Sequence, residues 1–78
     1  MSTVSALKRL LSSMRSDPAL LELPDDASLL TDVRLDSLEL LNFMLEIEAK
    51  LALHIDFEHL DYDHLRSLAD LAAFLDAS

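Results

Sequence analysis

Residues 35–51 read LDSLELLNFMLEIEAKL, and this stretch decides the fold because it holds a helix start and two apolar stripes. Asp36 is a residue type that caps helices, and Glu39, three residues later, favours the helix dipole. At about 100° per residue, one stripe predicts a core face, formed by Leu40, Phe43, Met44, Ile47 and Leu51. The other stripe lies roughly opposite and consists of Leu38, Leu41 and Leu45. A small domain cannot easily bury both faces, so residues 37–51 predict a helix with an exposed apolar stripe.

Upstream of this helix, the sequence predicts another amphipathic helix and a long loop. Ser2 or Thr3 can cap the first helix, whose apolar stripe consists of Val4, Leu7, Leu10, Leu11 and Met14. Asp17-Pro18 ends the pattern, because the residue before a proline is pushed out of the helical region. Residues 16–35 sustain no period, although a short helical turn fits residues 19–22. The leucines in this loop indicate that it lies over the core.

Downstream, the sequence predicts a short helix and then a longer one. Residues 56–66 are compatible with a short third helix that includes Leu60 and Leu65. Ser67 caps the last helix with Asp70 at its third position, and the apolar residues are Leu68, Leu71, Ala72, Phe74 and Leu75. Strand signals are weak. The prediction is an all-α fold, a small four-helix bundle of three longer helices and one short helix with a long first loop, in one domain of residues 1–78.

Composition excludes several classes of function. The chain has 78 residues, of which 51% are hydrophobic, so it is neither disordered nor large enough for two cores. Its 15 acidic and 6 basic residues give a net charge of −9, which argues against nucleic acid as a partner. The lack of cysteine and glycine removes disulfides, thiolate sites and Gly-rich phosphate loops. No signal or membrane-spanning segment is visible, so we expect a cytoplasmic protein without membrane insertion.

The titratable residues provide few candidates for catalysis. The three histidines stand five residues apart, at His54, His59 and His64. On a helix this spacing turns successive rings by about 140°, so a shared metal site is not expected and the rings should be exposed. Asp61 or Asp63 could pair with a histidine as a general base, but no nucleophile lies nearby in the sequence. Asp25-Asp26 has too few ligands for a calcium loop. We therefore expect no enzyme and no metal site.

Ser37 is a candidate modification site. It occupies the first position of the predicted helix, where the helix dipole favours a phosphate group. The acidic residues beside the two stripes are Glu39, Glu46 and Glu48. They can serve solubility alone or form a docking surface for a basic partner, and composition does not separate these readings.

The segment Leu35-Asp36-Ser37-Leu38-Glu39-Leu40-Leu41 resembles the Asp-Ser-Leu motif that opens the second helix of acyl carrier proteins. Both flanks of the motif also resemble that family, from the first amphipathic helix to the ending 66–75. The resemblance implies that Ser37, within the motif of Asp36 and Leu38, receives 4′-phosphopantetheine from coenzyme A. A separate phosphopantetheinyl transferase uses magnesium for this transfer. The thiol of the arm would then hold an acyl group as a thioester, and the core stripe would wall a cavity for it.

The resemblance also implies partners. The docking residues would be Leu38, Glu39, Leu41, Leu45, Glu46 and Glu48. The enzymes that dock there would be the transferase, an acyl-loading ligase or acyltransferase, and downstream synthases or transferases, with the carrier acting as a monomer. Many family members have a glycine shortly before the motif, where this chain has Val33-Arg34-Leu35. This departure and a slightly longer segment 55–65 indicate a specialised, free-standing carrier of a fatty-acid or polyketide-type pathway.

Two alternatives remain at this point. One is an aminoacyl or peptidyl carrier of a nonribosomal-peptide-type pathway, which shares the fold. The other is an unmodified helical adaptor whose exposed stripe, Leu38, Leu41 and Leu45, binds a partner helix.

Overall fold

The computed structural model describes residues 2–77, which form three α-helices and two short 3-10 helices. In chain order these are α1 (Thr3–Arg15), η1 (Pro18–Glu22), α2 (Ser37–Leu51), η2 (Tyr62–Leu65) and α3 (Leu68–Asp76). No residue from 2 to 77 lies in a strand, so the predicted all-α fold is confirmed. Met1 and Ser78, which the predicted domain of 1–78 includes, lie outside the described residues. None of the helices described is long and apolar enough to cross a membrane.

The ends of α1 follow from local sequence. The Ser2 side chain caps the helix by accepting the Ser5 N–H at 3.1 Å. Ser16 leaves the helix in the left-handed region, with φ 53°, and the Asp17 N–H donates to the Ser12 carbonyl at 3.0 Å. This pattern closes many helices by bonding their last carbonyl groups. Pro18 then opens η1, which confirms both the predicted stop and the helical turn that follows it.

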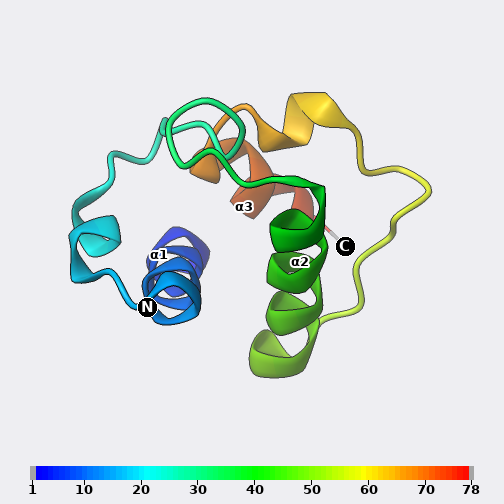
Figure 1. Ribbon diagram of the computed structural model, residues 1–78. Coiled ribbons are helices and arrows are strands. Elements are labelled where there is room, and N and C mark those ends of the chain that lie inside the picture. Colours follow the sequence, from blue (N-terminus) through cyan, green and yellow to red (C-terminus); the bar gives the residue numbers. More distant parts are fainter. Residues whose placement is uncertain (1, 78) are drawn as a thin grey trace.

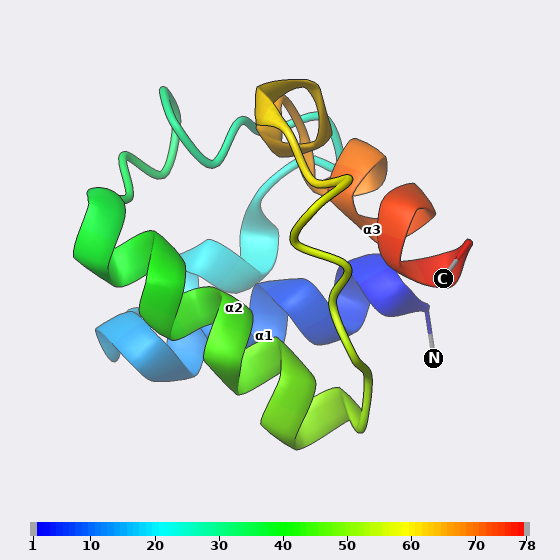
Figure 2. The same cartoon turned by 90° about the vertical axis from the view of Figure 1, so that its right-hand side faces the viewer.

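α1 is the central helix of the bundle. It contacts η1, α2 and α3, and Figures 1 and 2 show α2 and α3 on different sides of it. Its Leu7 and Leu11 are fully buried, as are Phe43 and Ile47 of α2. At one end of the bundle, the Thr3 hydroxyl donates to the Asp76 carboxylate at 2.6 Å, so the start of α1 lies beside the end of α3. The side chains that form the core come from all three α-helices and from the loops between them.

The long loop before α2 lies over the core, as its leucines predict. Its buried residues are Ala27, Leu29, Val33 and Leu35. Its backbone also completes α3, because the Leu68 N–H donates to the Ala27 carbonyl at 3.0 Å and the Ala69 N–H to the Asp25 carbonyl at 2.9 Å. The first N–H groups of a helix have no acceptor inside that helix. The loop supplies these acceptors, and Figure 1 shows it passing above the helices on its way to α2.

The predicted third helix is shorter than expected. Only Tyr62–Leu65 forms a helical turn, η2, and Leu60 lies before it, so the expected extent was wrong. The Asp56 and Asp61 carboxylates each accept the backbone N–H of the residue two positions later, at 3.2 and 2.9 Å. Such bonds offer the backbone an alternative to a longer helix. Leu65 lies in this turn, as predicted, and is buried.

Candidate functional site

Ser37 lies at the start of α2, directly after a fully formed helix cap. The Asp36 carboxylate accepts the Glu39 N–H at 2.7 Å, and the Glu39 carboxylate accepts the Asp36 N–H at 3.3 Å. This reciprocal pair fixes the first turn of the helix. Ser37 itself is exposed, and its hydroxyl makes no hydrogen bond to any of the residues 2–77. The site therefore presents a free hydroxyl on a rigid helix start.

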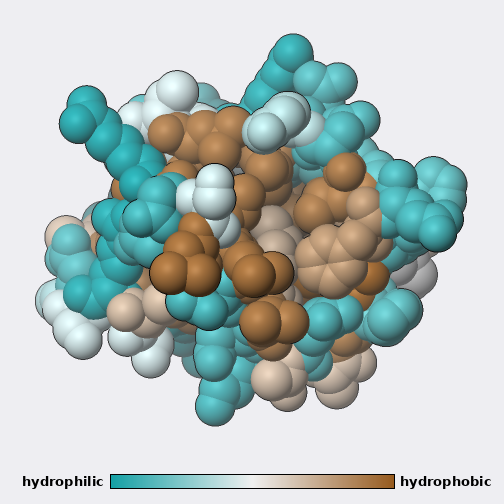
Figure 3. All heavy atoms as spheres, turned by 45° about the vertical axis from the view of Figure 1, so that its right-hand side comes forward, coloured by the Kyte–Doolittle hydropathy of each residue, from teal (hydrophilic) through white to brown (hydrophobic). Residues whose placement is uncertain are grey.

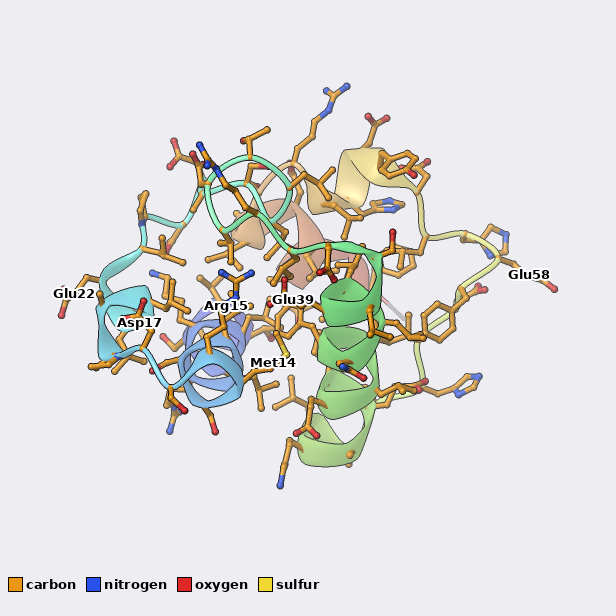
Figure 4. The ribbon with its side chains drawn as sticks, in the orientation of Figure 1. Met14, Arg15, Asp17, Glu22, Glu39 and Glu58 are labelled. Carbon is orange, nitrogen blue, oxygen red and sulfur yellow. The ribbon has the colours of Figure 1, made fainter. Side chains whose placement is uncertain are left out.

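Arg15, the last residue of α1, forms hydrogen bonds with the loop and with the first turn of α2. Its Nη2 donates to the Arg34 carbonyl at 3.2 Å and to Glu39 Oε1 at 3.0 Å. Figure 4 shows the Arg15 side chain rising from α1 towards Glu39 at the end of α2 that follows the loop. From the sequence, Arg15 is only a basic residue in the last turn of a helix, where lysine and arginine are common. Its partner 24 residues away in sequence was not predicted.

Arg34 adopts a backbone conformation that glycine adopts more readily than arginine. Its φ is 62°, in the left-handed region that favours glycine because a Cβ crowds the following carbonyl there. Arg34 lies within the Val33-Arg34-Leu35 segment, where many acyl carrier proteins have a glycine. The chain thus forms a left-handed turn before Asp36 without a glycine.

α2 has two apolar faces, as the sequence predicts. Phe43, Met44 and Ile47 are at most 2% exposed, whereas Leu40 and Leu51 are half-buried at the edges of the core. The opposite stripe is open to solvent, with exposed fractions of 68% for Leu38, 50% for Leu41 and 51% for Leu45. Two further exposed apolar side chains, Phe57 and Tyr62, follow α2 in the chain. Figure 3, turned so that the α2 side comes forward, shows apolar atoms gathered across the middle of this face.

The three glutamates of α2 differ in their surroundings. Glu39 binds Arg15, and the Glu48 carboxylate accepts the Ile55 N–H at 2.8 Å, so both carboxylates have partners within the chain. Glu46 is exposed and lines a hollow of about 470 Å³ between α1 and α2. The other residues of this hollow are Leu10, Ser13, Met14, Asn42, Leu45 and Lys50. Glu46 is therefore the glutamate of this helix whose carboxylate is free to face a partner.

The three histidines differ in their surroundings. No group of three or more possible metal ligands occurs among residues 2–77, and the His54 and His59 rings are 96% and 74% exposed. His64 departs from the expected exposure, because its ring packs on Phe74 with a centroid distance of 4.3 Å. Its Nδ1 also accepts the Asp61 N–H at 3.0 Å, so His64 closes the turn of η2.

The arrangement at Ser37 fits the attachment of a phosphate-linked group. A phosphodiester on this hydroxyl would lie in solvent at the N-terminus of a helix of 15 residues, whose dipole favours negative charge. Asp36 contributes its bond to the Glu39 backbone, which keeps its carboxylate engaged in the cap. The Glu39 carboxylate is likewise engaged, by the Asp36 N–H and by Arg15.

A small acidic helical bundle with an exposed serine at the start of α2 has the features of a carrier domain. The protein family described as "Phosphopantetheine attachment site" matches residues 3–75. The chain therefore belongs to this family, and it is a carrier domain of the acyl carrier protein type. The family carries covalently attached 4′-phosphopantetheine, and its carrier domains are generally not catalytic. Comparisons with curated proteins and with solved structures found no match.

Proposed function

We propose that Ser37 is the residue of this carrier domain that receives 4′-phosphopantetheine. In the reaction, the Ser37 oxygen bonds to the phosphorus next to the pantetheine of coenzyme A. The bond from that phosphorus to the rest of the diphosphate breaks, adenosine 3′,5′-bisphosphate leaves, and the serine loses its proton. A separate phosphopantetheinyl transferase with Mg²⁺ performs this step. The exposed, unbonded Ser37 hydroxyl at the start of α2 is the observation that carries the proposal.

The residues around Ser37 prepare it for this reaction. Asp36 and Glu39 fix the first turn of α2, so the hydroxyl is presented at one place relative to the docking face. The thiol at the end of the arm supplies a site where an acyl group is held as a thioester. Phe43, Met44 and Ile47 are closely packed, so a chain sheltered among them would require these side chains to move apart.

The face beside Ser37 is proposed as the docking surface for partner enzymes. Its apolar centre is formed by Leu38, Leu41 and Leu45, with Glu46 as its free carboxylate. Glu39 and Glu48 add negative charge at its edges while holding the backbone, so substituting them would change both docking and local structure. A net charge of −9 favours partners with basic surfaces. These partners are the transferase, an acyl-loading ligase or acyltransferase, and a downstream synthase or transferase.

The proposed cargo is an acyl group of a specialised fatty-acid or polyketide-type pathway. The aminoacyl or peptidyl carrier is the alternative, since both classes share this fold. Loading assays distinguish them: the phosphopantetheinylated chain should accept acyl groups from an acyl ligase and should not accept amino acids from an amino-acid-activating enzyme. Loading by the second enzyme alone would assign the chain to the peptide class.

Intact-mass spectrometry tests the attachment itself. The purified chain is incubated with coenzyme A, Mg²⁺ and a phosphopantetheinyl transferase that modifies a known carrier in parallel. We expect one added phosphopantetheine in the wild-type chain and in Ser13→Ala, a serine on the exposed side of α1, and none in Ser37→Ala. Wild-type chain that stays unmodified would support the unmodified adaptor, whose apolar stripe is equally exposed.

A further inference from the structure

Arg15 links the last turn of α1 to both sides of Ser37. Its Nη2 lies 3.2 Å from the Arg34 carbonyl, which precedes the serine, and 3.0 Å from each carboxylate oxygen of Glu39, which follows it. Glu39 Oε1 also accepts the N–H of Asp36, the residue next to the serine. One guanidinium therefore holds the loop and the helix cap that together position Ser37 (Figure 4).

The Arg15 side chain faces the interior of the molecule more than the docking face. It is 29% exposed, and its Nε is buried without a hydrogen-bond partner among the described residues. Salt therefore screens the Arg15–Glu39 pair less than it screens a surface pair. Because Arg15 binds the backbone and the cap beside Ser37, it can act on the serine through them. The exposed apolar stripe of α2 is left to meet the partner.

We infer that Arg15 is a positioning residue for phosphopantetheine transfer to Ser37, an inference that rests on the function proposed above. Two effects support it. The bond to the Arg34 carbonyl favours a left-handed conformation, φ 62°, which a residue with a Cβ does not readily adopt alone. The positive charge also offsets the Glu39 carboxylate close to the place where the phosphodiester adds negative charge. Removing Arg15 therefore loosens the loop and raises the negative charge around the serine.

Steady-state kinetics of the transfer reaction test this inference. Initial rates are measured at varied carrier concentration with coenzyme A, Mg²⁺ and the transferase. For Arg15→Met we expect kcat to fall about tenfold and KM to change less than about twofold, because positioning rather than docking is lost. Arg15→Lys keeps the charge and should recover part of kcat. Arg9→Met is the matched control, since the Arg9 side chain is exposed on the same helix and makes no hydrogen bond or ion pair within residues 2–77.

A double-mutant cycle separates the path through Glu39 from a general charge effect. Glu39→Gln should slow transfer less than Arg15→Met, and the double variant should be no slower than Arg15→Met alone. Thermal melts confirm that each variant is folded at the assay temperature, and the amide resonance of Asp36 reports the state of the cap. If Arg15→Met does not fold, Arg15→Lys is compared with the wild-type chain instead. Its kcat should also fall, but by less than tenfold.

The possible outcomes are distinct. The positioning role is overturned if folded Arg15→Met has the same kcat as the wild-type chain. It is also overturned if Arg9→Met loses as much kcat as Arg15→Met. A raised KM with unchanged kcat also overturns it and assigns Arg15 to docking. If the wild-type chain takes no phosphopantetheine while a known carrier does, the proposed function fails and the positioning role fails with it. The wild-type reaction thus tells the two failures apart.

Discussion

At the scale of single residues, three positions adopt a left-handed backbone in a chain that has no glycine. They are Ser16, Arg34 and Ala52, with φ values of 53°, 62° and 53°. Each follows a helix or precedes one, where the chain must change direction. A Cβ in this region costs about 1–2 kcal/mol relative to the right-handed region. The Arg15 side chain donates to the Arg34 carbonyl, whereas no side chain among residues 2–77 bonds to the backbone of Ala52, an exposed residue at the end of α2.

Ala52→Gly should therefore stabilise the protein. Glycine removes the Cβ conflict at φ 53° but adds freedom to the unfolded chain, and we expect a net gain of about 0.5–1 kcal/mol in the free energy of unfolding. Ala49→Gly is the control, because Ala49 is exposed inside α2. There, glycine should destabilise by about 1 kcal/mol. Urea denaturation of the three proteins measures both, and destabilisation by Ala52→Gly would contradict the left-handed conformation.

The pKa of Asp56 provides a second test at this scale. A hydrogen bond with the His59 ring is the main cause that lowers the pKa of the Asp56 carboxyl below its ordinary 3.8. The stabilisation from this contact is present above that value and is lost as the pH falls through the lowered pKa. An NMR titration of the Asp56 carboxyl carbon should show the low midpoint. His59→Ala should raise it towards 3.8, and His54→Ala, whose ring lies near Glu48 instead, should leave it unchanged.

At the scale of elements, α2 has a buried apolar side in the core and an exposed apolar side that we propose for docking. Phe43 is fully buried, and Leu41 is half exposed on the opposite stripe. Phe43→Ala should cost about 3–5 kcal/mol, because it leaves a cavity in the core. Leu41→Glu should change stability by less than about 0.5 kcal/mol and should weaken binding to partner enzymes. Denaturation and transferase kinetics on both variants measure this, and the reverse order of stability would mean that the faces are assigned wrongly.

The elements that the sequence predicts well are those whose signals are local. The starts of α1, α2 and α3 depend on a capping side chain that accepts a backbone N–H three residues later. The sequence therefore predicts Asp36 and Ser67 as caps, and Ser2 as one of two candidates with Thr3. The bounds of η2 could not be predicted, because the Asp56 and Asp61 side chains bond to the backbone two residues later. These bonds leave no trace in the spacing of the apolar residues. Ser37 could be read as a candidate from its motif, but Arg15 could not, because its contact depends on how α1 packs beside the loop.

At the scale of the whole molecule, acidic charge is spread over a very small body. The chain carries a net charge of −9 within dimensions of 30 × 23 × 22 Å. Three of its six lysine and arginine residues form ion pairs with acidic residues, in the pairs Lys8–Asp25, Arg15–Glu39 and Arg66–Asp63. The unpaired carboxylates that remain repel one another, and this repulsion opposes the compact state. The charge that would attract the proposed basic partners thus reduces the stability of the folded chain.

Added salt should therefore raise the Tm. At 0.01 M ionic strength the Debye length is about 30 Å, as long as the molecule itself, whereas at 0.1 M it is about 10 Å and distant carboxylates no longer interact. If screening adds about 1 kcal/mol, the Tm should rise by about 4–8 °C between these conditions, measured by circular dichroism.

Glu22→Lys, at an exposed position in η1, lowers the net negative charge by two. Because self-repulsion grows with the square of the charge, the rise should shrink to roughly 60% in this variant. A Tm that falls with salt would instead show that the three ion pairs outweigh the repulsion.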